Sequence, residues 1–229
     1  MHKVVNSNFE SFGNVVFASE CYHFTEKMHI DFPNAKEKLS KGHMYDLKTN
    51  VFEKLPDIFL DKKPNDKHEY IQILGLEKKT RVLKFIRKKY IENKTNLNYW
   101  KVFVPKSNGS GSLGETSSTP LIGKPLIGEP YTGNTQTFIS IGKFETKLEA
   151  MAAFKYVKTK FIRVLIGILK ITQDNPKSTW ALVPMQDFTI NSDIDWSKSI
   201  HEIDLQLYKK YNLSNEEINF IETKVQAME

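Results

Sequence analysis

Apolar and polar residues follow a strand, helix, strand order between residues 70 and 105. They alternate from Tyr70 to Leu76, which is the two-residue period of a strand. From Thr80 to Ile91 the apolar residues recur at helical spacing, with the basic residues mostly on the opposite side. Residues 99–105 again read as a strand. This succession spans about 35 residues and predicts a βαβ unit.

Weaker patterns flank this unit. Residues 6–17 carry phenylalanines at helical spacing and predict a short helix or a loop. Residues 23–67 are rich in Pro, Asn, Asp and Lys, which is typical of loops and short elements. Residues 136–141 alternate as a strand, and residues 180–185 predict a further short strand.

Helices are predicted in the last third of the chain, where two capping boxes mark helix starts. These are Thr146 with Glu149 and Ser214 with Glu217. The first box begins an apolar pattern that predicts one long helix ending near Leu169. Residues 200–211 carry a separate apolar stripe, so we expect two helices in the tail.

Together these elements predict an α+β fold in which a mixed sheet packs against helices and C-terminal helices follow. We expect an N-terminal segment of residues 1–69 that packs on the core, an α/β core of residues 70–189 and a C-terminal helical extension of residues 190–229. The core contains a Gly- and Ser-rich loop at residues 107–130. Loops of this length within a domain are usually functional or disordered, so a mobile linker is the alternative reading.

Composition narrows the class of protein. The chain is 40% apolar and 12% aromatic, which is enough to form a core. The single cysteine, Cys21, cannot form an internal disulfide, so a reduced, cytoplasmic protein is expected. No apolar run approaches the ~18 residues of a membrane span, and we expect no membrane partner.

The net charge of +6 is unevenly distributed. Residues 61–106 hold 13 basic and 5 acidic residues, whereas residues 190–229 hold 4 basic and 8 acidic residues. A concentrated basic block is what phosphate binding requires. The alternative is a solvated face in a lysine-rich chain. The acidic tail suits a packing element better than a nucleic-acid surface.

Two enzyme signatures are present only in part. The run Gly109-Ser-Gly-Ser-Leu-Gly114 has dinucleotide-binding spacing, but Gly and Pro follow it where a helix should begin. His201-Glu202 begins like a zinc-protease helix, yet Leu205 stands where the second histidine ligand belongs. We therefore expect neither a nucleotide cofactor nor a metal.

Two other functions remain open beside phosphate binding by the basic block. A metal-dependent nuclease needs clustered carboxylates near a lysine, and Asp57 with the Glu145-Thr-Lys147 run could supply them. A protein-interaction module that docks on a catalytic subunit through the acidic tail is the other alternative.

Several runs of the second half occur together in one family. They are Lys101–Gly111, Pro120–Gly123, Thr137–Gly142, Lys155–Phe161, Leu169–Gln173, Val183–Phe188 and Asp195–Lys198, with the closing helices near residues 202–222. In this combination the chain resembles the C-terminal target-recognition region of type II restriction-modification adenine-specific DNA methyltransferases. The resemblance covers about residues 70–229.

The resemblance implies a DNA-reading module without the catalytic domain. Members of this family carry an Asn/Asp-Pro-Pro-Tyr/Phe motif and a Gly-rich cofactor motif, but here Asn175-Pro176 is followed by Lys177 and neither motif is present. Duplex DNA and a methyltransferase or restriction catalytic domain or subunit are the implied partners, in a bacterial cytoplasm. S-adenosylmethionine is expected only in that catalytic part, with no catalytic residue in this chain.

Under this interpretation phosphate contacts position the duplex and base contacts specify its sequence. The residues predicted to position DNA are those of the basic helix: Lys78, Lys79, Arg81, Lys84, Arg87 and Lys88. The residues predicted to read bases are Lys106, Ser107, Asn108, Ser110 and Ser112. A further group is predicted to flank them: Lys143, Lys170, Thr172 and Gln173.

Overall fold

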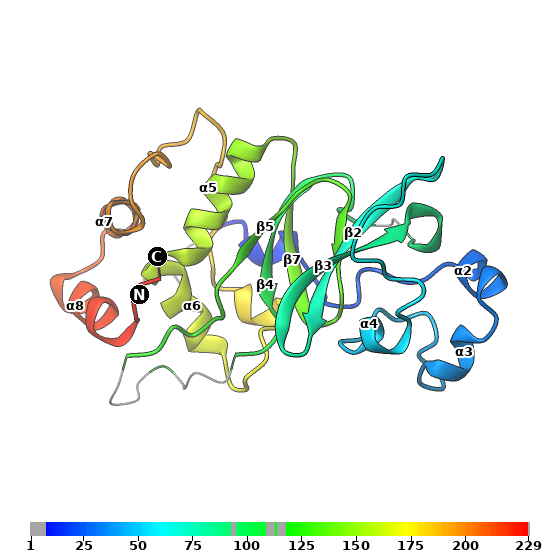
Figure 1. Cartoon of the computed structure of the whole chain (residues 1–229). Helices are drawn as coiled ribbons and strands as arrows, with labels where there is room; N and C mark the ends of the chain where they lie inside the picture. The colour runs from blue at the N-terminus through cyan, green and yellow to red at the C-terminus, as the bar shows by residue number, and fades with distance from the viewer. Residues whose placement is uncertain (1–7, 93–94, 109–112, 114–117, 229) are drawn as a thin grey trace.

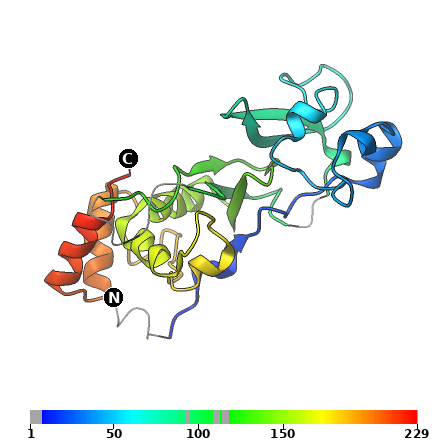
Figure 2. The same ribbon diagram turned by 90° about the horizontal axis from the view of Figure 1, so that it is seen from below.

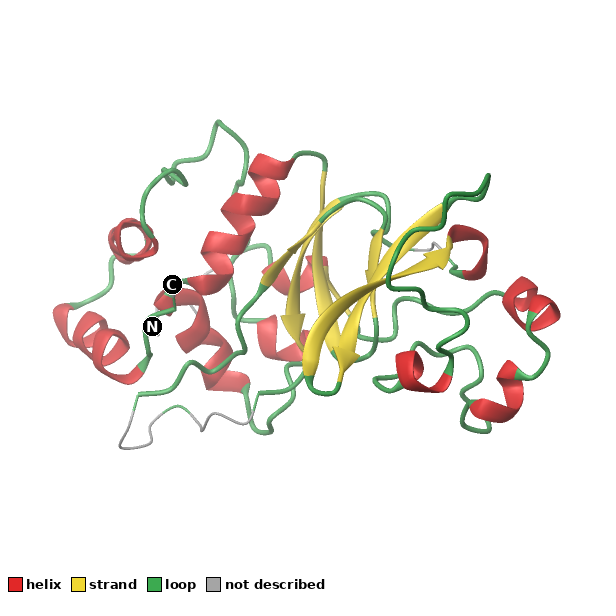
Figure 3. Cartoon of the chain, in the orientation of Figure 1, coloured by secondary structure: helices red, strands yellow, loops and turns green. Residues whose placement is uncertain are grey.

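The computed structural model describes residues 8–92, 95–108, 113 and 118–228. Two sheets stand next to each other in the middle, with longer helices on one side and short helices on the other (Figure 1, Figure 3). The strands are β1 (Val16–Phe17), β2 (Tyr70–Glu77), β3 (Thr80–Arg87), β4 (Trp100–Pro105), β5 (Leu126–Gly128), β6 (Thr132–Asn134) and β7 (Phe138–Phe144). The helices are α2 (Glu26–Asp31), α3 (Ala35–Lys38), α4 (Val51–Lys54), α5 (Lys147–Lys158), α6 (Lys160–Leu169), α7 (Ile200–Lys210) and α8 (Asn215–Lys224), with 3₁₀ turns η1 (Phe12–Val15), η2 (Lys88–Tyr90) and η3 (Lys177–Trp180). The α+β class is confirmed.

The larger sheet has the order β1-β7-β4-β5 and is antiparallel throughout. In its centre Val104 of β4 lies opposite Ile139 of β7, and both side chains are buried. Most residues of both strands are buried, so the strands predicted for residues 99–105 and 136–141 are confirmed. The third strand, β5, lies inside the segment that the sequence predicts to be one loop.

The smaller sheet has the order β3-β2-β6 and includes a strand where the sequence predicts a helix. Residues 80–87 form a strand that pairs antiparallel with β2 along its whole length, so the predicted helix of residues 80–91 and its βαβ unit are wrong. Lys84 and Ile86 are buried and their neighbours are more exposed, which is the period of a strand. Because β6 pairs parallel to β2, this sheet is mixed, as expected.

Thr159 divides residues 147–169 into two helices, so the single long helix that the pattern predicts is wrong. Its extended backbone, with ψ at 148°, ends α5, and its side chain accepts a hydrogen bond from the Ile162 amide to begin α6. Both predicted capping boxes are confirmed, and a third one, Ser199 with Glu202, begins α7. Among the described residues, none of the helices is long and apolar enough to cross a membrane.

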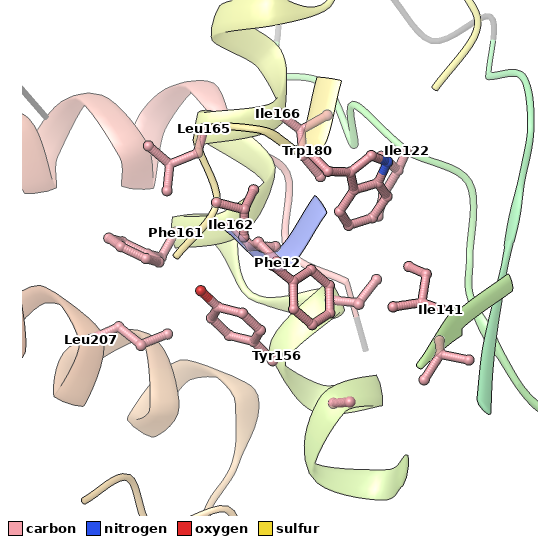
Figure 4. Packing of buried hydrophobic residues seen from close by; sticks show 14 of the residues in the cluster. Phe12, Ile122, Ile141, Tyr156, Phe161, Ile162, Leu165, Ile166, Trp180 and Leu207 are labelled. Atoms are coloured by element: carbon pink, nitrogen blue, oxygen red, sulfur yellow. The ribbon is translucent and has the colours of Figure 1, made fainter. Parts of the chain in front are cut away.

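The larger hydrophobic core lies between the four-stranded sheet and helices α5 and α6 (Figure 4). Phe12 comes from the N-terminal segment and meets Tyr156 edge to face, with ring centroids 5.5 Å apart. Trp180 is fully buried in the same core. It ends a 3₁₀ turn, so the strand predicted for residues 180–185 is wrong.

A second core joins the short helices α2, α3 and α4 to the β2–β3 hairpin. It contains Phe52 from α4 together with Ile73 and Ile86 from the two strands, and all three are buried. Its members come from both sides of residue 70, where the sequence analysis places a boundary. Figure 2 shows this part standing apart from the longer helices.

Candidate nucleic-acid interface

The turn between β2 and β3 consists of Lys78 and Lys79, whose φ angles are positive at 47° and 66°. A two-residue hairpin turn of type I′ needs such angles, and Asn-Gly is favoured there because glycine lacks the Cβ atom that strains this backbone and the short side chain of Asn can hydrogen-bond locally. Both lysines are exposed, and neither forms an ion pair within the described residues. This lysine turn joins β2 and β3 at the lower end of their hairpin in Figure 1 and therefore presents two ammonium groups to solvent.

A cleft with a volume of about 480 Å³ lies between the two sheets, close to the lysine turn. Stretches that are distant in the sequence contribute to it: the hairpin, the end of β4, the start of β7 and the segment after α6. Its lining residues are Thr49, Leu76, Arg81, Pro105, Lys106, Ser107, Gln136, Thr137, Phe138 and Asp174. The cleft therefore brings together Arg81, Lys106 and Ser107, which the sequence analysis assigns to two different groups.

Arg81 is held in place on the wall of the cleft. Its Nη1 donates a hydrogen bond to the carbonyl oxygen of Lys124 at 2.9 Å. Its guanidinium also lies over the buried ring of Phe138, 5.7 Å from the centroid. Partial burial lowers the pKa of Arg81, but an arginine remains charged at neutral pH. Four of its five N–H donors have no part in the bond to Lys124 and can serve a ligand.

The start of the Gly- and Ser-rich loop is fixed against residues 173–175. Ser107 and Asp174 form an antiparallel bridge, and the Ser107 hydroxyl donates to the Asp174 carboxylate. The amide of Asn108 donates to the carbonyl oxygen of Gln173 at 2.9 Å. The structure therefore places part of the predicted base-reading group beside part of the predicted flanking group.

Three predicted phosphate contacts farther along the chain from the turn, one in the middle of β3 and two at its end, are paired with carboxylates. We call Lys84, Arg87 and Lys88 the hairpin base. The pairs are Lys84 with Glu77 at 2.7 Å and Asp61 at 2.9 Å, Lys88 with Glu69 at 3.3 Å, and Arg87 with Asp66 at 3.9 Å. Burial of the stem opposes the charge of Lys84, but its two hydrogen-bonded carboxylates raise its pKa overall. These pairs reduce the positive charge that the hairpin base offers to a phosphate.

The other predicted cations differ in their distance from the cleft. Lys106 lines the cleft and is 3.4 Å from Glu20. Lys170 donates to the carbonyl oxygen of Leu121 at 2.5 Å, and partial burial lowers its pKa. Lys143 lies near the end of β7 that is remote from the cleft, so the structure does not bring it to the other residues.

The remaining predicted residues are small and polar. Thr172 and Gln173 are exposed next to the bridge, where the Thr172 hydroxyl accepts a hydrogen bond from the Asp174 amide at 3.3 Å. Ser110 and Ser112 lie outside the described residues. Most of the dinucleotide-like run from Gly109 to Gly114 also does.

Several residues that line the cleft were not predicted from the sequence. Gln136 and Thr137 directly precede β7, and polar residues at a strand end were a signal that could have pointed to them. Asp174 was overlooked because only its bridge to Ser107 brings it to the cleft. Thr49 lies in a segment without clear periodicity, so no pattern marked it.

The carboxylates proposed for a nuclease have other neighbours. Asp57 borders a separate cavity near α3 and is 3.9 Å from Lys38. Glu145 precedes α5, where its amide donates to the Glu149 carboxylate as part of the helix start. Within the part of the chain that the structure describes, no three His, Cys, Asp or Glu side chains are grouped to hold a metal ion.

The cleft and the lysine turn thus form one edge with exposed cations, a fixed guanidinium and small polar groups. No family model, curated protein or solved structure matches this chain. The chemistry of this edge suits an anionic polymer that also presents hydrogen-bonding groups, because its ammonium groups are solvated and its polar groups line a cleft.

Proposed function

We propose that this chain is a sequence-specific duplex DNA-binding module, the target-recognition part of a restriction-modification system. It would position DNA for an adenine methyltransferase or restriction activity located in another domain or subunit, which would also bind S-adenosylmethionine. The observation that carries the proposal is the lysine turn beside a cleft that contains Arg81 and Ser107.

The geometry supports different roles for the lysine turn and the cleft. The major groove of B-DNA admits a two-stranded β-ribbon, and beyond Leu74, where pairing with β6 ends, the β2–β3 hairpin continues as two strands with cations at its tip. The lysine turn would neutralise phosphates, while the cleft behind it would face base edges. Phosphate contacts set the register and base contacts read the sequence.

The backbone of the lysine turn supports the same proposal. A residue with a side chain is strained in the left-handed region by about 1–2 kcal/mol, and glycine relieves that strain. Lys78 and Lys79 both adopt it. Strain retained at an exposed position is expected where the side chains themselves have a use.

The salt dependence of binding tests the proposal. We expect the chain to bind a pool of random duplexes with an affinity that falls steeply with salt, because bound cations release counterions. The double variant Lys78→Gln with Lys79→Gln should reduce the logarithmic salt slope by about 2. The measurement is a fluorescence anisotropy titration at several salt concentrations.

A matched control removes two positive charges from the acidic tail, with Lys198→Gln and Lys209→Gln. This control should leave the salt slope within about 0.5 of the parent, since Lys198 precedes α7 and Lys209 lies in it, and α5 stands between α7 and the two sheets (Figure 1). Salt-independent binding by the parent, or an equal loss in the control, would show that the proposed function is wrong.

A further inference from the structure

Two opposite charges line the cleft without pairing with each other. Arg81 and Asp174 both border it, and the described residues show no ion pair between them. Arg81 is held by Lys124 and Phe138, while Asp174 is held by the Ser107 hydroxyl. Each group is therefore fixed by its own neighbours and keeps hydrogen-bonding capacity for a ligand. That ligand must offer acceptors to the guanidinium and a donor to the carboxylate.

A G·C base pair presents this combination in the major groove. Guanine offers two adjacent acceptors, N7 and O6, which an arginine can bind with two N–H groups, and cytosine offers its N4 amino donor to a carboxylate. An A·T pair places a donor next to the adenine N7, and its thymine O4 would face the carboxylate as acceptor against acceptor.

We propose that Arg81 and Asp174 read one G·C base pair of the target DNA, with Arg81 on guanine and Asp174 on cytosine. This inference rests on the proposed function, because it names the base pair that the cleft would recognise. Arg81 is suited to this role because its guanidinium is already oriented by Lys124 and Phe138, so little side-chain freedom is lost on binding. Asp174 is suited because its bridge to Ser107 fixes the carboxylate at the cleft.

Selection from a random duplex library gives the first test. The parent should enrich a motif that contains an invariant G·C pair. Arg81→Gln and Asp174→Asn should each relax the selection at the same position of that motif, since both residues would contact the same pair. Lys79→Gln is the matched control, because it should weaken binding to all duplexes alike and leave the motif unchanged.

Direct titration measures how strongly the chain discriminates between a G·C and an A·T pair at the selected position. The parent should bind a duplex with A·T at that position about 10- to 100-fold more weakly than the selected duplex. For either variant this ratio should fall to about threefold or less. Melting curves of each variant show whether it folds like the parent.

Modified DNA keeps the test independent of variant folding. A 7-deazaguanine at the selected guanine removes the N7 acceptor and should weaken binding by the parent about 10-fold. The same change at a G·C pair outside the motif should have no effect.

The failures of the two proposals are distinguishable. A parent that binds no duplex in a salt-dependent way would contradict the proposed function itself. A parent that enriches a motif, when both variants retain it or relax different positions, would overturn only the assignment of Arg81 and Asp174. Full binding to the 7-deazaguanine duplex would also overturn it.

Discussion

The lysine turn and the hairpin base are both basic in sequence but differ in the structure. At the hairpin base, Lys84, Arg87 and Lys88 are paired with carboxylates. At the lysine turn, Lys78 and Lys79 have no ion pair among the described residues. The acidic partners of the base include Asp61, Asp66 and Glu69, which lie in the segment that precedes β2. A count of charges along the chain cannot separate solvated cations from neutralised ones.

The backbone conformation also differs between the lysine turn and the hairpin base. The lysine turn holds two residues with positive φ, whereas the hairpin base has ordinary strand pairing, as with Tyr70 opposite Arg87. The base also covers the second core, where the Lys84 ammonium lies 5.9 Å from the Phe52 ring centroid. We infer that the base serves stability and the turn serves binding.

The largest effect is expected from charge reversal at the turn. Lys78→Glu with Lys79→Glu should lower the affinity for duplex DNA about 100-fold near 0.1 M salt, because two attractive charges become repulsive. Arg87→Gln with Lys88→Gln should lower it less than about threefold, because those cations are already paired. Anisotropy titrations of both variants measure the difference in affinity. An equal loss of affinity would remove the distinction between the lysine turn and the hairpin base.

Loss of a side chain at the base should instead affect stability. Lys84→Ala should lower the free energy of unfolding by about 1–2 kcal/mol, because it removes a buried stem and the partner of Glu77. Lys84→Met keeps most of the apolar stem, so its free energy of unfolding should fall by less. Urea denaturation measures both, and DNA affinity should stay within about twofold of the parent. Unchanged stability in Lys84→Ala would show that the base has no structural role.

Relief of strain at the turn should separate stability from binding. Lys78→Asn with Lys79→Gly supplies the favoured type I′ residues and should raise the free energy of unfolding by about 1 kcal/mol. The same variant should bind DNA more weakly, because it removes both ammonium groups. Lys78→Gln with Lys79→Gln is the control that keeps the strain, and it should lose affinity without gaining stability. A destabilised Asn-Gly variant would contradict the strain argument.

The smallest effect is expected in the loss of stability at low pH, through Asp66 at the hairpin base. Hydrogen bonds from the His68 amide and the Tyr70 hydroxyl, both at 2.9 Å, lower the pKa of Asp66 below its usual 3.8. Because the folded pKa is depressed, its stabilising contribution is present above about pH 4 and is lost as pH falls through the folded pKa. Asp66→Asn should therefore flatten the loss of stability below pH ~4, as followed by urea titrations. An unchanged acid profile would show that Asp66 contributes nothing to it.

Much of the fold was predictable because its signals are local. The central strands β4 and β7 are short runs of mostly apolar residues, and the capping boxes at Thr146 and Ser214 mark helix starts within four residues. Strand β3 was not predicted, because Val82, Phe85 and Ile86 fit a helical spacing as well as a strand. The turn of the β2–β3 hairpin consists of two lysines, without the Asn or Gly that normally marks such a turn, so the sequence gives no signal of the hairpin.

The candidate site was predictable only in part. Arg81, Lys106 and Ser107 were expected from charge and from the Gly- and Ser-rich loop, and all three line the cleft. Asp174 was not, because its position depends on pairing with Ser107, a contact between distant segments. The neutralised cations of the hairpin base could not be recognised either, since their partners are set by the fold.

Lysine acylation footprinting tests most directly whether the lysine turn contacts DNA. The free chain and its complex with duplex DNA are labelled briefly, and the labelling ratio at each lysine is read by mass spectrometry. We predict that DNA protects Lys78 and Lys79 at least about fivefold and leaves Lys88 within about 1.5-fold of the free chain. Protection of Lys88 with unchanged labelling of Lys78 and Lys79 would contradict the account.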